Sequence, residues 1–83
     1  MKIKVRYFAS VREALGPEDS VELPAGSSVG ALRDLLIARS DTHRRVLARE
    51  RALRVALNLQ MSGENASITE GAEVAFFPPV TGG

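Results

Sequence analysis

The sequence contains no cysteine, and it has a single histidine among its 83 residues. Without cysteine the chain has no disulfide framework, no thiolate metal site, and no cysteine nucleophile or persulfide. The chain has one histidine and no obvious cluster of catalytic residues, so it has few groups that could act in general acid–base catalysis. We therefore expect a chain that binds no metal and no cofactor. If it takes part in sulfur chemistry, another protein must supply the sulfur.

An excess of charge of either sign is also missing, as is any long apolar run. Eleven Lys and Arg residues balance ten Asp and Glu residues, so the formal net charge is +1, which supplies no broad electrostatic field for nucleic acid. No apolar stretch approaches the length of a membrane span, and the first residues alternate charged and apolar side chains instead of forming a signal sequence. We expect a cytoplasmic protein that binds neither nucleic acid nor membranes.

Alternating patterns predict five strands in a single small domain. The first begins near the start of the chain, with Ile3, Val5 and Tyr7 pointing inward and Phe8 on the opposite side. The other strands are expected at residues 20–23, 52–58, 60–61 and 73–77.

One long helix is predicted after Ser27 or Ser28, either of which can cap it. Its apolar positions recur three and four residues apart and form one stripe: Val29, Leu32, Leu35 and Leu36. Shorter helices are expected at residues 10–15 and 42–50. The second of these is strongly basic and is interpreted as a solvated face, with His43 as an ordinary surface residue.

The order strand, strand, long helix, strand, short strand, strand predicts an α+β fold in which a mixed sheet curls around one main helix. The ubiquitin-like β-grasp is the small fold that fits best. We expect a β-grasp domain at residues 1–77 and a projecting tail at residues 78–83. In that fold the first and last strands are central neighbours, so Phe8 and Phe77 would form an apolar patch at the root of the tail.

The sequence ends in Phe76-Phe77-Pro78-Pro79-Val80-Thr81-Gly82-Gly83. Two consecutive prolines favour an extended, polyproline-like segment, so the six residues of the tail should project with a reach of roughly 20 Å. Glycine has no Cβ, so Gly82 and Gly83 can pass through a narrow channel and leave the final carbonyl open to attack. A frayed terminus is the alternative interpretation.

These residues resemble the family of molybdopterin synthase small subunits, which are ubiquitin-like sulfur carriers. The resemblance spans nearly the whole chain. Its most specific part is the run at residues 73–83, supported by Asn58 and by the segment Phe8-Ala9-Ser10-Val11-Arg12-Glu13. Ala72 departs from the family, whose members usually carry an acid there, and the change affects only a local turn.

The resemblance implies a role in molybdenum cofactor biosynthesis. An E1-like adenylyltransferase would use ATP to adenylate Gly83, and a sulfur donor protein would convert the adenylate to a thiocarboxylate. Inside the large subunit of molybdopterin synthase, this sulfur would attack cyclic pyranopterin monophosphate. The chain would then be a non-catalytic sulfur-donor subunit, and two copies would flank a large-subunit dimer in a heterotetramer.

The resemblance also assigns roles to individual residues. Gly83 would carry the sulfur, and Gly82 would provide clearance. Four residues would guide insertion of the tail: Pro78, Pro79, Val80 and Thr81. Three would anchor the large subunit, because aromatic and methionine side chains are favoured at interface centres: Phe8, Met61 and Phe77. For Met61, a place in the core is the equal alternative.

Three other functions fit parts of the same pattern. The first is a ubiquitin-like protein modifier joined through Gly83 to lysines of its targets. The second is a sulfur carrier for thiazole, thiolated tRNA or cysteine synthesis, although residues 76–79 favour the molybdopterin branch. The third is a plain binding module, which gives no reason for an unblocked diglycine end.

Overall fold

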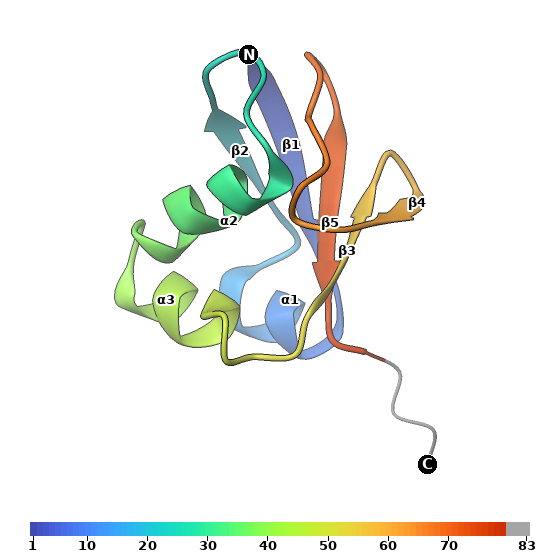
Figure 1. Cartoon of the computed structure of the whole chain (residues 1–83). Coiled ribbons are helices and arrows are strands. Elements are labelled where there is room, and N and C mark those ends of the chain that lie inside the picture. The colour runs from blue at the N-terminus through green and yellow to red at the C-terminus, as the bar shows by residue number, and fades with distance from the viewer. Residues whose placement is uncertain (80–83) are drawn as a thin grey trace.

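The computed structural model describes residues 1–79 as one mixed sheet packed against three helices (Figure 1). The sheet has the strand order β2-β1-β5-β3-β4. Its strands are β1 (Lys2–Tyr7), β2 (Glu18–Glu22), β3 (Arg54–Leu57), β4 (Gln60–Ser62) and β5 (Glu73–Phe77). The helices are α1 (Ala9–Leu15), α2 (Val29–Ile37) and α3 (Asp41–Leu47). The predicted α+β fold with a β-grasp arrangement is confirmed.

The centre of the sheet is the parallel pair of β1 and β5, in which Tyr7 lies opposite Phe76. The other strand pairs in residues 1–79 are antiparallel. The first and last strands are therefore side by side, as the sequence predicted. Because the two strands run in the same direction, the start of the chain and the end of β5 lie at opposite ends of the sheet (Figure 1).

The inward-facing residues of the sheet meet one face of α2. Ile3, Val5 and Tyr7 in β1 are buried, as predicted, and so are Val74 and Phe76 in β5. On α2 the buried apolar residues are Val29, Leu32 and Leu36. Ser28 caps this helix, because its hydroxyl accepts a hydrogen bond from the amide of Ala31 at 3.1 Å.

The predicted apolar stripe of α2 is wrong at one position. Leu35 is 37% exposed, whereas Arg33, which was not part of the stripe, is buried with only 6% of its surface exposed. A buried guanidinium is tolerated only when its donors are satisfied, because an unpaired charge removed from water is costly. The surroundings of Arg33 explain how this charge is accommodated.

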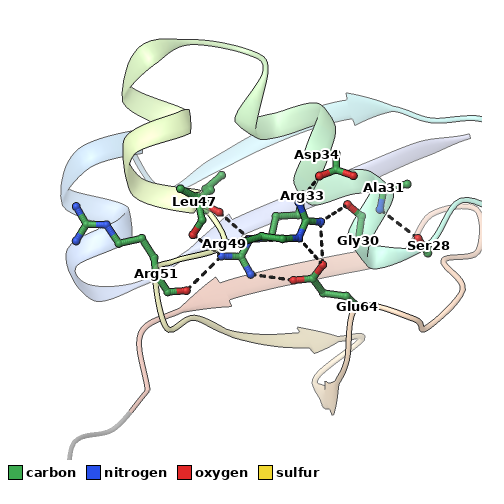
Figure 2. Close-up of polar contacts among 10 residues, drawn as sticks. Ser28, Gly30, Ala31, Arg33, Asp34, Leu47, Arg49, Arg51 and Glu64 are labelled. Atoms are coloured by element: carbon green, nitrogen blue, oxygen red, sulfur yellow. Dashed lines mark hydrogen bonds and ion pairs between the residues drawn. The ribbon is translucent and has the colours of Figure 1, made fainter.

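Arg33 closes the C-terminal end of α3 (Figure 2). Its Nε donates to the carbonyl oxygen of Leu47 at 2.7 Å, and its Nη2 donates to that of Ala48 at 2.8 Å. The last carbonyls of a helix have no partner within the helix, so these bonds satisfy groups that would otherwise be buried unpaired. The helix predicted at residues 42–50 therefore ends earlier, at Leu47.

Glu64 joins the loop after β4 to the same arginine. Its carboxylate accepts from Nη1 of Arg33 at 3.0 Å, and its other oxygen accepts from Nη2 of Arg49 at 2.8 Å (Figure 2). Arg49 also pairs with Asp34 on α2. Gly30 permits this close approach, because a Cβ at that position would lie 3.2 Å from Oε1 of Glu64.

The interpretation of the basic segment as a purely solvated face is wrong for His43. Its side chain is only 14% exposed, and its Nε2 lies 3.0 Å from the carboxylate of Asp19 on β2. The hydroxyl of Tyr7 donates to the same carboxylate at 2.7 Å. Burial alone would raise the pKa of Asp19, but the hydrogen bonds from His43 and Tyr7 outweigh it and hold that pKa below its ordinary value. The hydrogen bonds among Tyr7, Asp19 and His43 hold α3 against β1 and β2.

Replacing Arg33 with methionine should destabilise the fold strongly. The carbonyl of Leu47 would lose a partner in a buried setting, and the carbonyl of Ala48 and the carboxylate of Glu64 would lose one in a partly buried setting. We expect a loss of about 2–4 kcal/mol in the free energy of unfolding, measured by urea denaturation.

The matched control is Arg49→Met, which removes an exposed partner of the same Glu64. Because water can replace the lost contacts there, its loss of stability should be clearly smaller. Equal losses for the two variants would contradict the role assigned to Arg33.

Candidate functional site

The face of the sheet turned away from the helices carries an apolar patch. Side chains alternate along a strand, so residues next to buried ones point to this open face. The register places Arg6, Ala75, Ala56 and Met61 in one row across β1, β5, β3 and β4. Phe8 and Phe77 lie beyond this row, toward the end of β5. We define the open-face patch as Phe8, Ala56, Met61, Ala75 and Phe77.

Phe8 extends the central ladder by one residue beyond β1. Its amide donates to the carbonyl of Phe76 at 3.2 Å, which places its backbone beside the end of β5. Its side chain is 39% exposed. The guanidinium of Arg6 lies 5.7 Å from the centroid of the Phe8 ring, a cation–π distance that restricts the ring. Phe8 and Phe77 thus occupy one corner of the open face, as predicted.

Met61 lies on β4 and is 59% exposed, so the alternative that it fills the core is wrong. Next to it, Leu59 was missed by sequence reasoning: it is 89% exposed at the tip of the β3–β4 turn. Asn58 and Leu59 both have left-handed backbones, with φ of 50° and 70°. A two-residue hairpin turn of this kind favours Asn followed by Gly, so leucine at its second position is the signal that could have been noticed.

Asn58, which supports the family resemblance, has a structural role in the turn between β3 and β4. Its amide donates to the carbonyl of Glu73 at 2.8 Å, and its side-chain oxygen accepts from the amide of Glu73 at 3.0 Å. These two bonds tie the β3–β4 turn to the start of β5. The position of Met61 relative to the central strands is fixed as a result.

The tail begins at a basic corner of the molecule. Phe77, the last residue of β5, pairs with Arg54 at the start of β3. Pro78 then lines a hollow of about 260 Å³ together with residues of α1, α3 and the segment before β3, among them Arg45 and Arg51. Pro78 and Pro79 are both half-buried. The remaining predicted site residues lie outside the described part of the chain: Val80, Thr81, Gly82 and Gly83.

Residues 1–79 contain no gathering of three or more His, Asp or Glu side chains that would hold a metal ion. In the same residues, none of the helices combines the length and the apolar composition that crossing a membrane requires.

Comparisons with known proteins agree on the kind of chain this is. Residues 5–83 match the ThiS family. The chain is 47% identical over 83 residues to the molybdopterin synthase sulfur carrier subunit of Escherichia coli, covering 98% of this chain and 99% of that protein.

Solved structures show the same fold. SAMP1 of Haloferax volcanii superposes with a TM-score of 0.83 at 25% identity and covers all of both chains. A putative molybdopterin converting factor subunit 1 of Pyrococcus furiosus gives a TM-score of 0.73 at 29% identity, over 96% of this chain and 99% of the other.

Replacing Leu59 with glycine should stabilise the fold. A left-handed backbone costs a residue with a side chain roughly 1–2 kcal/mol, and part of this gain is offset by the greater freedom of glycine in the unfolded chain. We expect a net gain of about 0.5–1 kcal/mol in the free energy of unfolding, measured by urea denaturation. Leu59→Ala is the control, because it removes the exposed side chain but keeps Cβ and the strain. An equal gain in both variants would show that exposure, and not the backbone, is the cause.

Proposed function

The chain belongs to the ThiS family, and from that premise we propose that it is the sulfur carrier subunit of a molybdopterin synthase. The observation that carries this proposal is the 47% identity to the Escherichia coli subunit of that name over nearly all of both chains. The sequence of this chain also ends in the Phe76-Phe77-Pro78-Pro79 segment and in the two glycines that follow Thr81.

The reacting group in this proposal is the carboxylate of Gly83. A carboxylate resists nucleophiles because its charge is delocalised and oxide is a poor leaving group. An E1-like adenylyltransferase joins it to AMP from ATP, and pyrophosphate leaves. Sulfur supplied by a donor protein then displaces AMP at the acyl carbon, which gives a thiocarboxylate. That sulfur is the nucleophile delivered to cyclic pyranopterin monophosphate.

Residues 1–77 act as the rigid domain and residues 78–83 as the tail. The position of β5 between β1 and β3 supports this division, because Phe77 pairs with Arg54 on β3 and the preceding Phe76 accepts a hydrogen bond from the amide of Phe8. Pro78, Pro79, Val80 and Thr81 guide the tail into the active site of a partner. Gly82 gives clearance for the acyl group of Gly83.

The open-face patch is the docking surface for the large subunit of the synthase. Phe8, Met61 and Phe77 are its anchors, because large side chains at the centre of a desolvated patch carry most binding energy. Phe8 and Met61 are 39% and 59% exposed, so they can transfer apolar surface to a partner without unfolding this chain. The tail begins directly beside this corner of the patch.

The chemistry beyond sulfur transfer belongs to the partners. The large subunit supplies acid, base and phosphate-binding groups, and this chain binds no cofactor itself. Two copies flank a large-subunit dimer in a heterotetramer, and the complex acts in the cytoplasm.

A protein modifier is the second candidate function, because SAMP1, the small archaeal modifier protein 1, has the same fold over its whole length. Intact mass analysis of protein purified from its own cells separates the two. A carrier shows one terminal oxygen replaced by sulfur, whereas a modifier appears in larger conjugates linked through Gly83.

Adding one alanine after Gly83 should abolish sulfur loading and pterin conversion and leave stability unchanged. The reacting carbonyl would be displaced by one residue, and the added Cβ would obstruct the narrow channel that admits glycine. Loading is measured by intact mass after incubation with the activating enzyme, ATP and the sulfur donor. Normal conversion by a protein verified to keep the extra alanine would overturn the proposal.

Replacing Phe77 with alanine should weaken binding to the large subunit about tenfold or more, equal to roughly 1.4 kcal/mol, because an aromatic anchor beside the root of the tail is lost. Affinity is measured by calorimetric titration, and folding by urea denaturation. Leu35→Ala is the matched control, since Leu35 is a large, partly exposed apolar residue that lies on α2, away from the open-face patch. Unchanged affinity for Phe77→Ala, or an equal loss in the control, would argue against the open-face patch.

A further inference from the structure

Two arginines lie among the apolar side chains of the open face. Arg6 is on β1, opposite Ala75 of β5, and Arg54 is on β3, opposite Phe77 of β5. Because Val55 is buried, the alternation along β3 turns Arg54 to the same face as Phe77. Since β5 lies between β1 and β3, the two arginines flank it on its two sides (Figure 1).

The spacing of the two arginines follows from the register of the sheet. Arg6 and Arg54 are separated by two strand spacings of ~4.8 Å each and by two residues, about 7 Å, along β5, so their Cα atoms are about 12 Å apart. Ala75 and Phe77 lie between them. A protein surface that covers the open-face patch must therefore cover both guanidinium groups as well.

The guanidinium of Arg6 is only partly satisfied within the chain. Its Nη1 lies 3.9 Å from Oε1 of Glu73, which is too far for a hydrogen bond. Its Nε is buried and has no acceptor among residues 1–79. The contact with the ring of Phe8 orients the group but occupies none of its N–H donors. A buried donor without an acceptor costs free energy, so Arg6 gains by turning to an acceptor on another protein.

Arg54 presents an exposed charge beside Phe77. In the described part of the chain, no carboxylate lies within ion-pair distance of its guanidinium. Arg44 on α3 is different, because its guanidinium donates to the carboxylate of Asp41 at 2.8 Å. All the N–H donors of Arg54 are thus available to a partner that covers this corner of the open face.

Docking on the open-face patch removes both guanidinium groups from water. The cost of that desolvation is offset only if each charge meets an acceptor of good geometry. A carboxylate fits best, because it carries the opposite charge and forms two parallel N–H···O bonds with a guanidinium. The phosphates of a nucleic acid fit less well, because a chain with a net charge of +1 has no broad positive field to hold them.

We propose that Arg6 and Arg54 select the partner that docks on the open-face patch, by pairing with two carboxylates of the large subunit. These carboxylates lie on either side of the apolar area that receives Phe8 and Phe77. Because one arginine is on each side of β5, the two ion pairs also fix the orientation of the docked chain. This inference rests on the proposed function in taking the large subunit as the partner.

The test measures the affinity of the full chain for the large subunit by calorimetric titration at low and high salt. Arg6→Met and Arg54→Met keep an apolar side chain of similar length and remove the charge. Each should weaken binding about 30-fold or more, because a carboxylate of the partner is left buried and unpaired. Each should also reduce the dependence of affinity on salt. Arg44→Met is the matched control and should bind as the native chain does, since Arg44 lies on α3.

Exchange of charges between the two proteins identifies the carboxylates. Arg54→Glu should bind at least as weakly as Arg54→Met, and an arginine in place of one Asp or Glu of the large subunit should restore its affinity. The same scan with Arg6→Glu should select a different acidic residue. A purely structural role for either arginine could not be rescued by a change in the partner. Urea denaturation checks that every variant is as stable as the native chain.

Phe77→Ala separates this inference from the proposed function. If Phe77→Ala binds weakly but Arg6→Met and Arg54→Met bind normally, the arginines have no part in recognition and only this inference is overturned. If all three variants bind normally, the open-face patch is not the docking surface and both proposals about it are wrong. Sulfur loading of Gly83 is assayed separately, so a failure of the carrier role would appear there.

Three further results would also overturn the inference. One is an equal loss of affinity in Arg44→Met, which would show that net charge alone governs binding. Another is self-association of the native chain that Arg6→Met and Arg54→Met abolish without changing the affinity for the large subunit, which would assign the face to a second copy. The third is the same pattern with a labelled single-stranded oligonucleotide, which would assign the face to nucleic acid.

Discussion

The parallel pairing of β1 with β5 is the constraint on which the rest of the structure depends. It joins segments about seventy residues apart in the sequence, with Val5 opposite Val74 and Tyr7 opposite Phe76, so its loop-closure entropy must be offset by the core it assembles. The same pairing places β3 on the free side of β5 and leaves one face of the sheet uncovered. The tail root and the open-face patch meet at one corner because of this pairing.

Arg33 connects this sheet to the helical layer. Its guanidinium reaches both the end of α3 and the loop that carries Glu64. Removing a charged side chain from water costs free energy. The guanidinium of Arg33 tolerates burial because each of its nitrogens donates to an acceptor: the carbonyls of Leu47, Ala48 and Arg51 and the carboxylate of Glu64. The hydrogen bonds of Arg33 are directional, so they define where α3 ends and where β3 can begin.

Sequence reasoning succeeded where the cause is local. The bounds of β5 and the capping by Ser28 follow from alternation and from the chemistry of a helix start, which neighbouring residues determine. It failed where the cause is distant. Arg33 is buried because of Leu47 and Glu64, which are 14 and 31 residues away, and β2 begins at Glu18 because Arg6 pairs with it across the sheet. At the candidate site, Phe8 and Phe77 were predicted on the open face, and Met61 was left open between an anchor and a place in the core. The exposed Leu59 was overlooked, although a leucine after Asn58 in a hairpin turn is visible in the sequence.

The topology also decides which residues surround the point where β5 ends. In a parallel pair the two strands start at the same end, so side chains early in β1, such as Lys2 and Lys4, are necessarily far from the point where β5 ends. An antiparallel neighbour does the opposite: β3 begins where β5 ends, which brings Arg54 next to Phe77. The segment that leads into β3 must reach the same corner, and it carries Arg51. The strand order therefore gathers arginines at the root of the tail and places both lysines toward the other end of the sheet.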